Sequence, residues 1–396
     1  MEHDERLVFS ASTQVSALGA GKESARRALR TEESGLRRWE SETDPMSTWV
    51  GWVDGLDEPL TGSLAPFDCR NNRLALATLE SDGFLAQAQE AVRRYGPGRI
   101  GVFVGTSTSG ILGTELAYRQ RDPETGALPP LDYRHTHNLY ATADLVRTVL
   151  GLEGPSMVVS TACSSSAKVF AVAQRHLEAG LCDAAIVGGV DSFCLSTFYG
   201  FHSLGLVSTQ PCRPWDRERD GINLGEAGGF VLLERSSESA GSVLLQGYGE
   251  SSDAHHMSTP HPEGRGAETA MRRALASAGL EPADIDHLNL HGTATVSNDQ
   301  AEDRAVTTLF GPGMTASSTK GWTGHTLGGA GVIEALFAQI ALEDGFVPAT
   351  LNTEQVDPEL RCGILSHGHE RPLRWVMSNS FGFGGSNCSL VLGGRS

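Results

Sequence analysis

Residues 157–179, MVVSTACSSSAKVFAVAQRHLEA, decide the fold class of this chain. The run at 157–160 predicts a short buried strand, because it is apolar and ends at small polar residues. Residues 167–179 predict a helix that is apolar on most of its faces and therefore lies in the interior. Only small residues separate the two elements, so the strand must turn directly into the helix. This connection is typical of α/β proteins.

Similar strand and helix patterns continue on both sides of this stretch. Apolar runs predict strands at 100–105 and 184–188, and apolar periodicity predicts helices at 73–93 and 267–278. Strands that alternate with helices along a whole chain indicate parallel sheets covered by helices. We therefore predict an α/β fold built in layers.

A second stretch repeats the first pattern. Residues 315–342, TASSTKGWTGHTLGGAGVIEALFAQIAL, contain a strand, a polar turn rich in Gly and Thr, and an apolar helix. This repetition predicts two similar αβ halves, at 1–245 and 246–396, with the functional site between them. The polar, proline-containing segment 122–140 predicts a long loop that either covers the site or meets a second subunit.

The composition limits the possible functions. The chain has 396 residues, of which 39% are hydrophobic and 20% charged, and this fits a folded globular protein. Its formal net charge of −17 argues against binding to nucleic acid or anionic membranes. No apolar run approaches the roughly 18 residues of a membrane span, and the start lacks a signal-peptide core, so we expect a cytoplasmic protein. The seven cysteines form no CxxC pair, which disfavours a disulfide framework and a zinc ribbon.

Cys163 lies in the turn between the predicted strand and helix, within TACSSSA. Unpaired N–H groups and the dipole at a helix N-terminus stabilise an anion, so we expect a lowered thiol pKa and an available thiolate. The Cys163 N–H could also form one side of an oxyanion hole. A lone cysteine is more often a small buried core residue. Here the small residues on both sides leave room for a thioester and favour a nucleophile.

Two histidines lie in Gly- and Thr-rich turns that follow predicted strands. His291 lies in NLHGTAT and His325 in STKGWTGHTLGGAG. Each alone would more often be structural, but beside Cys163 they suit the decarboxylation of a malonyl thioester. Two neutral imidazoles can donate N–H bonds to the enolate oxygen that forms. Lys320 could supply positive charge with Glu334 as its ion-pair partner; an ordinary structural salt bridge is the other interpretation.

Four blocks of sequence occur in the same order as in a known family. TACSSSA, NLHGTAT, STKGWTGHTLGGAG and NSFGFGGSN resemble the signature blocks of elongating β-ketoacyl-acyl-carrier-protein synthases of the thiolase superfamily. The resemblance covers roughly residue 67 to the C-terminus. It implies a thiolase-like fold of two similar αβ halves packed in α-β-α-β-α layers, usually in a dimer. It also implies substrates carried on the phosphopantetheine of an acyl carrier protein, with no metal and no other cofactor.

The resemblance also implies roles for individual residues. Cys163 would accept the acyl chain, and His291 and His325 would promote decarboxylation and condensation. Phe383, in the FGFGG turn, matches a gating aromatic residue whose backbone N–H completes the oxyanion hole. The other matched positions are two supporting residues, two phosphopantetheine contacts, one acyl-pocket position and three arginines near the carrier protein: Lys320, Glu334, Thr293, Thr295, Thr108, Arg70, Arg73 and Arg213.

Two features bear on the substrate and the partner. Thr108 replaces a larger aliphatic residue that is common in the family, so a longer or stiffer chain such as a polyene could enter the pocket. The stretches FDCRNNRLALATLE and CLSTFYGFHSLGLVS resemble synthases of aryl-polyene pathways. Acyl carrier proteins are acidic, and Arg70, Arg73 and Arg213 are candidates for a basic landing site. Solvated surface arginines are an equally good interpretation of each.

Several functional alternatives remain open at this point. The main hypothesis is a decarboxylative Claisen condensation that elongates a fatty acid, polyene or polyketide chain. A thiolase or acyltransferase would use Cys163 without decarboxylation. An inert partner subunit is a third possibility, although Cys163 argues against it. The enzyme could be a homodimer, or it could be active only in a heterodimer with a chain-length-factor-like subunit.

Overall fold

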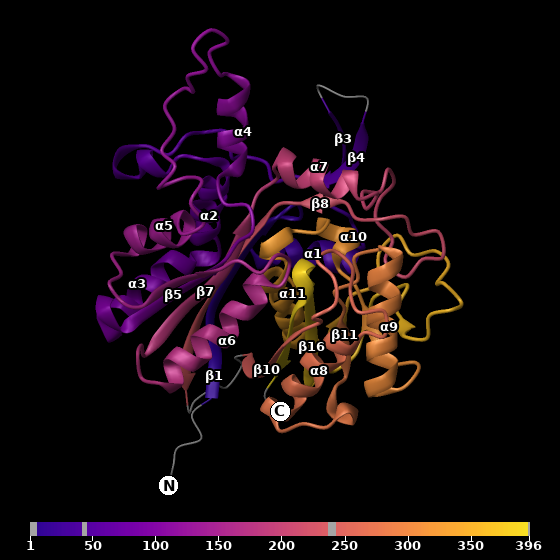
Figure 1. Cartoon of the computed structure of the whole chain (residues 1–396). Helices are drawn as coiled ribbons and strands as arrows, with labels where there is room; N and C mark the ends of the chain where they lie inside the picture. The colour runs from indigo at the N-terminus through magenta and orange to yellow at the C-terminus, as the bar shows by residue number, and fades with distance from the viewer. Residues whose placement is uncertain (1–5, 42–45, 237–242, 395–396) are drawn as a thin grey trace.

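The computed structural model describes residues 6–41, 46–236 and 243–394. One large sheet runs through the molecule, and each half of the chain contributes one end of it (Figure 1). In the first half the strands are adjacent in the order β1, β9, β7, β5, β6, and β7, β5 and β6 are parallel. These strands are β1 (Arg6–Ser16), β5 (Ile100–Gly105), β6 (Ser156–Val159), β7 (Ala184–Asp191) and β9 (Ala227–Ser236).

The second half continues the sheet in the order β10, β17, β16, β11, β12, β14, with the last four strands parallel. The halves meet where β1 pairs with β10. β2 pairs with β1 as a branch of this sheet, and two separate small sheets form from β3, β4 and β8 and from β13 with β15. The bounds are β2 (Gly19–Ala20), β3 (Arg37–Glu40), β4 (Ser47–Gly51), β8 (Leu224–Gly225), β10 (Leu244–Ser252), β11 (His287–Asn289), β12 (Thr315–Ser317), β13 (Phe346–Val347), β14 (Gly363–Ile364), β15 (His369–Glu370), β16 (Trp375–Gly382) and β17 (Ser386–Gly393).

Two central helices separate the ends of the sheet, and other helices cover its outer faces. α6 contacts α11, and between them they contact strands of both halves, whereas α2, α3 and α5 pack on the first half and α8 on the second. This is the predicted α-β-α-β-α layering of a thiolase-like fold. The bounds are α1 (Lys22–Thr31), α2 (Arg70–Glu80), α3 (Phe84–Tyr95), α4 (Ile111–Arg119), α5 (Ala141–Leu150), α6 (Ser165–Glu178), α7 (Leu195–Ser203), α8 (Arg265–Ala278), α9 (Val296–Phe310), α10 (Lys320–Thr323) and α11 (Ala330–Asp344).

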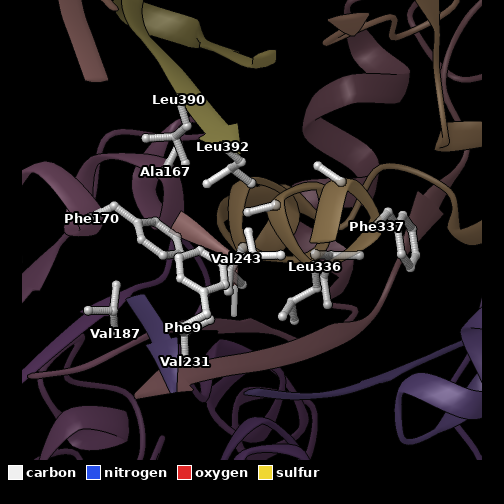
Figure 2. Packing of buried hydrophobic residues seen from close by; sticks show 14 of the residues in the cluster. Phe9, Ala167, Phe170, Val187, Val231, Val243, Leu336, Phe337, Leu390 and Leu392 are labelled. Atoms are coloured by element: carbon white, nitrogen blue, oxygen red, sulfur yellow. The ribbon is translucent and has the colours of Figure 1, made fainter. Parts of the chain in front are cut away.

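The central helices pack closely because small residues lie between them. A side chain at Gly331 of α11 would come within 2.5 Å of the Ala167 nitrogen of α6, so glycine is needed there. Around this contact, apolar side chains from the strands and from both helices fill the interior (Figure 2). Phe9 of β1 stacks on Phe170 of α6 with ring centroids 5.5 Å apart. The repeated strand–turn–helix pattern of the sequence therefore builds the centre of the molecule.

The structure corrects one predicted element and confirms others. The predicted helix at 73–93 is two helices, α2 and α3, because Asp82 in the Ser-Asp-Gly junction takes a φ of +54° that interrupts the helix. The segment 122–140 is a loop, as predicted, and extends away from the layers beyond α4 (Figure 1). In the described residues no helix is long and apolar enough to cross a membrane. The division at 245/246 stays a prediction.

His287 on β11 predicts a pH dependence of stability. Burial lowers its pKa to about 3, whereas an unfolded histidine titrates near 6.5. Below pH 6.5 the unfolded chain takes up a proton here that the folded protein does not, so the free energy of unfolding falls. Relative to His287→Gln, the wild-type protein should lose about 2 kcal/mol between pH 6.5 and 5 in urea unfolding. Parallel curves for the two proteins would contradict this, and exposed His367→Gln is the control.

Candidate active site

Cys163 lies where β6 turns into α6, as the sequence predicted. Ala162 just before it adopts a left-handed φ of +51°, which directs the chain sharply from the strand into the helix. The Ser165 hydroxyl accepts a hydrogen bond from the Thr161 N–H (2.9 Å) and donates one to the Ala162 carbonyl (2.5 Å). These bonds compensate for the strained turn and hold the buried Cys163 thiol at the start of the helix.

His325 contacts the thiol directly. Its Nε2 atom lies 2.9 Å from Cys163 Sγ. The backbone on both sides is fixed, because the His325 N–H donates to the Asn223 carbonyl (2.7 Å) and the His325 carbonyl accepts from the Gly225 N–H (3.0 Å). The turn after α10 is thus tied to β8, and the imidazole is held against the nucleophile.

His291 completes the cluster and, like His325, comes from the second half of the chain. Its ring is nearly perpendicular to that of His325, with centroids 5.4 Å apart. One sulfur atom and two ring nitrogens, one from each of Cys163, His291 and His325, lie within 4.8 Å of one another. The structure therefore brings together the three residues that the sequence singled out, although Cys163 lies more than 100 residues before either histidine in the chain.

A buried carboxylate that the sequence did not single out holds the His291 turn. Glu302 of α9 accepts hydrogen bonds from the N–H groups of His291 (2.8 Å) and Gly292 (2.9 Å) and from the Asn379 amide (3.2 Å). Burial raises the Glu302 pKa to about 7. The sequence carries little signal for this role, because Glu302 is one of several acidic residues in the polar stretch NDQAEDR at 298–304.

Lys320 and Glu334 form the expected ion pair. Lys320 Nζ lies 2.5 Å from Glu334 Oε1 and also donates to the His291 carbonyl. Both side chains are almost fully buried, so water does not screen their charges. The ammonium group therefore places a positive charge directly behind the two imidazoles.

The protonation states follow from burial and from this charge. Burial, and then the positive charge of Lys320, lowers the pKa of His291 and His325 well below the ordinary value, so both rings are neutral at pH 7. The lowered thiol pKa expected from the helix N-terminus is wrong. Burial raises the Cys163 pKa to about 12, although Lys320 and the Phe383 N–H act in the opposite direction. The resting state is therefore a thiol beside a neutral imidazole.

An open pocket with about 610 Å³ of empty space leads to these residues. Thr293 and Thr295 line it, and their hydroxyl groups lie 2.9 Å apart. Phe383 also lines the pocket, and its ring lies 5.4 Å from that of Phe201 on α7. A narrow molecule that carries a thioester can thus pass between polar hydroxyls and aromatic rings to the thiol.

Thr108 does not line this pocket. It is buried, and its hydroxyl donates to Asp191 Oδ1 at 2.8 Å. A carboxylate of the scaffold engages this hydroxyl group, and the role of Thr108 in an acyl pocket stays a prediction.

Two of the three candidate carrier-binding arginines form ion pairs within the fold. Arg70 forms a bidentate ion pair with the buried Glu226 (2.6 and 2.7 Å), and its side chain is only 10% exposed. Arg73 forms a bidentate pair with Asp68 (2.7 and 2.8 Å) and donates to two backbone carbonyls. Their donors are used internally, which does not favour a landing site, and their part in carrier binding stays a prediction. Arg213 is 26% exposed and remains a candidate.

Replacing Arg70 with Ala should therefore destabilise the protein rather than weaken carrier binding alone. The change leaves the Glu226 carboxylate buried without its cation, which costs about 3–5 kcal/mol. Urea unfolding measures this loss, and Arg213→Ala, which removes a half-buried guanidinium from a 3.9 Å ion pair, is the matched control. Equal stability of the two variants would contradict the assignment.

Three other pairs of histidines lie close together in the sequence, and the structure shows what surrounds them and the cysteines. Within the described residues, the active-site cluster is the only group of three or more possible metal ligands, so none forms at His135 and His137, His255 and His256, or His367 and His369. All seven cysteines are buried free thiols. Cys388 lies in the core on β17.

Comparisons with known proteins agree with this site. Residues 53–239 match the family described as "Beta-ketoacyl synthase, N-terminal domain", and residues 243–354 match "Beta-ketoacyl synthase, C-terminal domain". The chain is 32% identical to a 3-oxoacyl-acyl-carrier-protein synthase 2 from Rhizobium meliloti over 420 residues, which cover 98% of each protein. Over 309 residues, 74% of each protein, it is 34% identical to the enzyme of that name from Staphylococcus aureus.

Solved structures give the same result. A ketosynthase from Xenorhabdus doucetiae, solved in complex with its chain length factor, superposes with a TM-score of 0.92 at 38% identity and covers 100% of this chain and 99% of that one. A β-ketoacyl synthase from Burkholderia phymatum superposes with a TM-score of 0.86 at 26% identity, with 99% and 100% covered. The layered fold, the Cys-His-His cluster and these matches together show that the chain belongs to the β-ketoacyl synthase family.

Proposed function

We propose that this protein elongates acyl chains by decarboxylative Claisen condensation between an acyl group on Cys163 and a malonyl group on an acyl carrier protein. The observation that carries this proposal is the 2.9 Å contact between Cys163 Sγ and His325 Nε2, with the neutral His291 ring beside them. A thiol nucleophile suits acyl transfer, and paired neutral imidazoles suit an enolate.

In the first half-reaction the Cys163 sulfur attacks the acyl thioester carbonyl. His325 Nε2 accepts the thiol proton as the S–C bond forms, and this overcomes the high thiol pKa. The Cys163 and Phe383 N–H groups stabilise the tetrahedral oxyanion. The carrier thiolate then leaves and takes the proton from His325, so that both imidazoles are neutral again.

In the second half-reaction a malonyl thioester enters through the same pocket. Its C–C bond to the carboxylate breaks, CO₂ leaves, and the electron pair forms an enolate whose oxygen accepts N–H bonds from His291 and His325. The enolate carbon attacks the acyl carbonyl on Cys163. The Cys163 thiolate departs and takes one proton from solvent, and the β-ketoacyl product leaves on its carrier. Lys320 contributes positive charge behind His291 throughout.

Intact-protein mass spectrometry tests this sequence of steps. The purified chain is mixed first with an acyl carrier protein thioester and then with malonyl carrier protein. An acyl adduct on Cys163 that discharges as a β-ketoacyl carrier product supports elongation. If the acyl group leaves Cys163 only when an acetyl thioester rather than a malonyl thioester is added, the rival thiolase reaction is supported. An acyl adduct on a residue other than Cys163 would overturn the assignment of the nucleophile.

We also propose that a ketosynthase-like subunit covers the exposed apolar side chains of α4 and the loop after it. Leu116 is 43% exposed, and Tyr118 and Tyr133 are each 59% exposed. Such a cluster is costly in water and is typical of a subunit interface. The Xenorhabdus doucetiae relative was solved with a chain length factor, which supports a heterodimer over a homodimer. Acylation without condensation by the isolated chain would favour the heterodimer.

Finer features of the function stay predictions. The aryl-polyene pathway, the cytoplasmic location, delivery on phosphopantetheine past Thr293 and Thr295, and a landing site that includes Arg213 rest on the sequence and the family resemblance. A carrier-binding measurement with Arg213→Ala tests the last of these.

A further inference from the structure

Asp191 is a buried carboxylate at the end of β7, and it accepts hydrogen bonds from two separate loops. The hydroxyls of Thr106, Ser107 and Thr108 donate to it at 2.6, 2.6 and 2.8 Å. The N–H groups of Ser107 and Thr108 donate at 3.0 Å, and that of Gly328 at 2.6 Å. One carboxylate thus accepts hydrogen bonds from three hydroxyl groups and three backbone N–H groups, more than the end of one strand requires.

No ion pair among the described residues involves Asp191. Backbone N–H groups and hydroxyls alone compensate its charge. These donors come from the β5–α4 loop and from the turn after His325, so the carboxylate joins two segments that are more than 200 residues apart in the sequence. Removing it would leave several buried donors without an acceptor.

The turn on the His325 side is strained and shaped around this carboxylate. Leu327 takes a left-handed φ of +55°, which a non-glycine residue adopts only when its surroundings enforce it. At Gly328 a Cβ atom would lie 2.7 Å from Asp191 Oδ2. The strained residue and the close approach both lie within three residues of His325, whose Nε2 contacts the thiol.

We propose that Asp191 is a positioning residue that fixes the turn after His325 and thereby aims the imidazole at the reacting atoms. This inference rests on the proposed function, because it assigns Asp191 to the decarboxylation step. It deepens that function by naming the group that keeps the turn strained. Thr108, which was expected to line the acyl pocket, belongs to the same anchor.

The charge of Asp191 adds a second effect that is separable from its geometry. The Asp191 carboxylate is one of the groups that raise the Cys163 pKa, after burial. A neutral side chain at this position should therefore favour the thiolate. This prediction concerns the rate of thiol alkylation, which needs no carrier protein and no turnover.

The test compares Asp191→Asn with Asp303→Asn. Asparagine keeps the size of the side chain, but its amide NH₂ group would face hydrogen-bond donors that now point at a carboxylate oxygen. At Asp191 it should shift His325 and lower malonyl decarboxylation about 100-fold, while self-acylation of Cys163 falls much less. Asp303 is also a buried carboxylate that accepts two backbone N–H bonds, from Arg361 and Cys362 (2.8 Å each), outside the pocket. Its variant should lose stability without this split between the two half-reactions.

A second variant separates geometry from charge and covers the case in which Asp191→Asn does not fold. Gly328→Ala displaces the turn but keeps the carboxylate. Gly328→Ala should reproduce the loss of decarboxylation. The rate of Cys163 alkylation by iodoacetamide at fixed pH should be several-fold higher in Asp191→Asn than in Gly328→Ala, because only Asp191→Asn removes the charge. Wild-type decarboxylation rates in both folded variants would overturn the inference. Failure of the wild-type protein itself to decarboxylate would instead overturn the proposed function, and alkylation would still report on Asp191.

Discussion

Replacing Cys163 with Ala is expected to abolish self-acylation and condensation while malonyl decarboxylation continues. Loss of the nucleophile removes the covalent intermediate and should lower condensation by a factor on the order of 10⁴–10⁶. The two imidazoles have their own supports, Glu302 and Lys320 behind His291 and Asn223 behind His325, and none of these contacts depends on the sulfur. The site for the enolate oxygen should therefore survive the substitution.

Two measurements made on the same preparation test this expectation. Mass spectrometry detects the acyl adduct, and release of CO₂ from malonyl carrier protein reports decarboxylation. Cys388→Ala is the matched control, because Cys388 is also a fully buried thiol but lies in the core on β17. It should lose some stability and keep both activities. An acyl adduct that persists in Cys163→Ala would place the nucleophile elsewhere and overturn the site.

The sequence predicted the parts of the fold and the site that depend on local pattern. Cys163 was identifiable because a strand end, small residues and a helix start stand next to each other in the chain. The interior position of α6 was predictable because residues 167–179 are apolar on most of the helix faces. His291 and His325 stood out because Gly and Thr surround them, and such turns approach ligands closely.

Features that depend on long-range packing were not predictable in this way. Arg70 and Arg73 are one helical turn apart on α2 and resembled a basic surface, but their partners include Glu226, which lies 156 residues away. The helix N-terminus predicted a low thiol pKa, whereas the degree of burial that raises it is set by both halves of the molecule. Glu302 and Asp191 are single acidic residues whose roles arise only from the loops that fold around them.

The two histidines should differ in their effect on acylation, although both should be needed for decarboxylation. Removal of either N–H donor from the enolate should lower decarboxylation about 10²–10³-fold. His291→Ala should acylate at the wild-type rate, because the sulfur contacts His325. His325→Ala should acylate more slowly, because the thiol loses its proton acceptor, but not stop, since Lys320 and the Phe383 N–H still favour the thiolate.

Single-turnover acylation and malonyl decarboxylation, measured on each variant at pH 7, separate these roles. An Asn variant at each position separates hydrogen bonding from proton transfer, because its amide can still donate a hydrogen bond but cannot accept a proton at neutral pH. His325→Asn should therefore recover part of the decarboxylation but none of the acylation rate. Equal acylation by folded His291 and His325 variants would contradict a base role for His325 and would assign thiol activation to the helix terminus, Lys320 and Phe383. In that case the 2.9 Å contact would serve only to orient the ring toward the enolate.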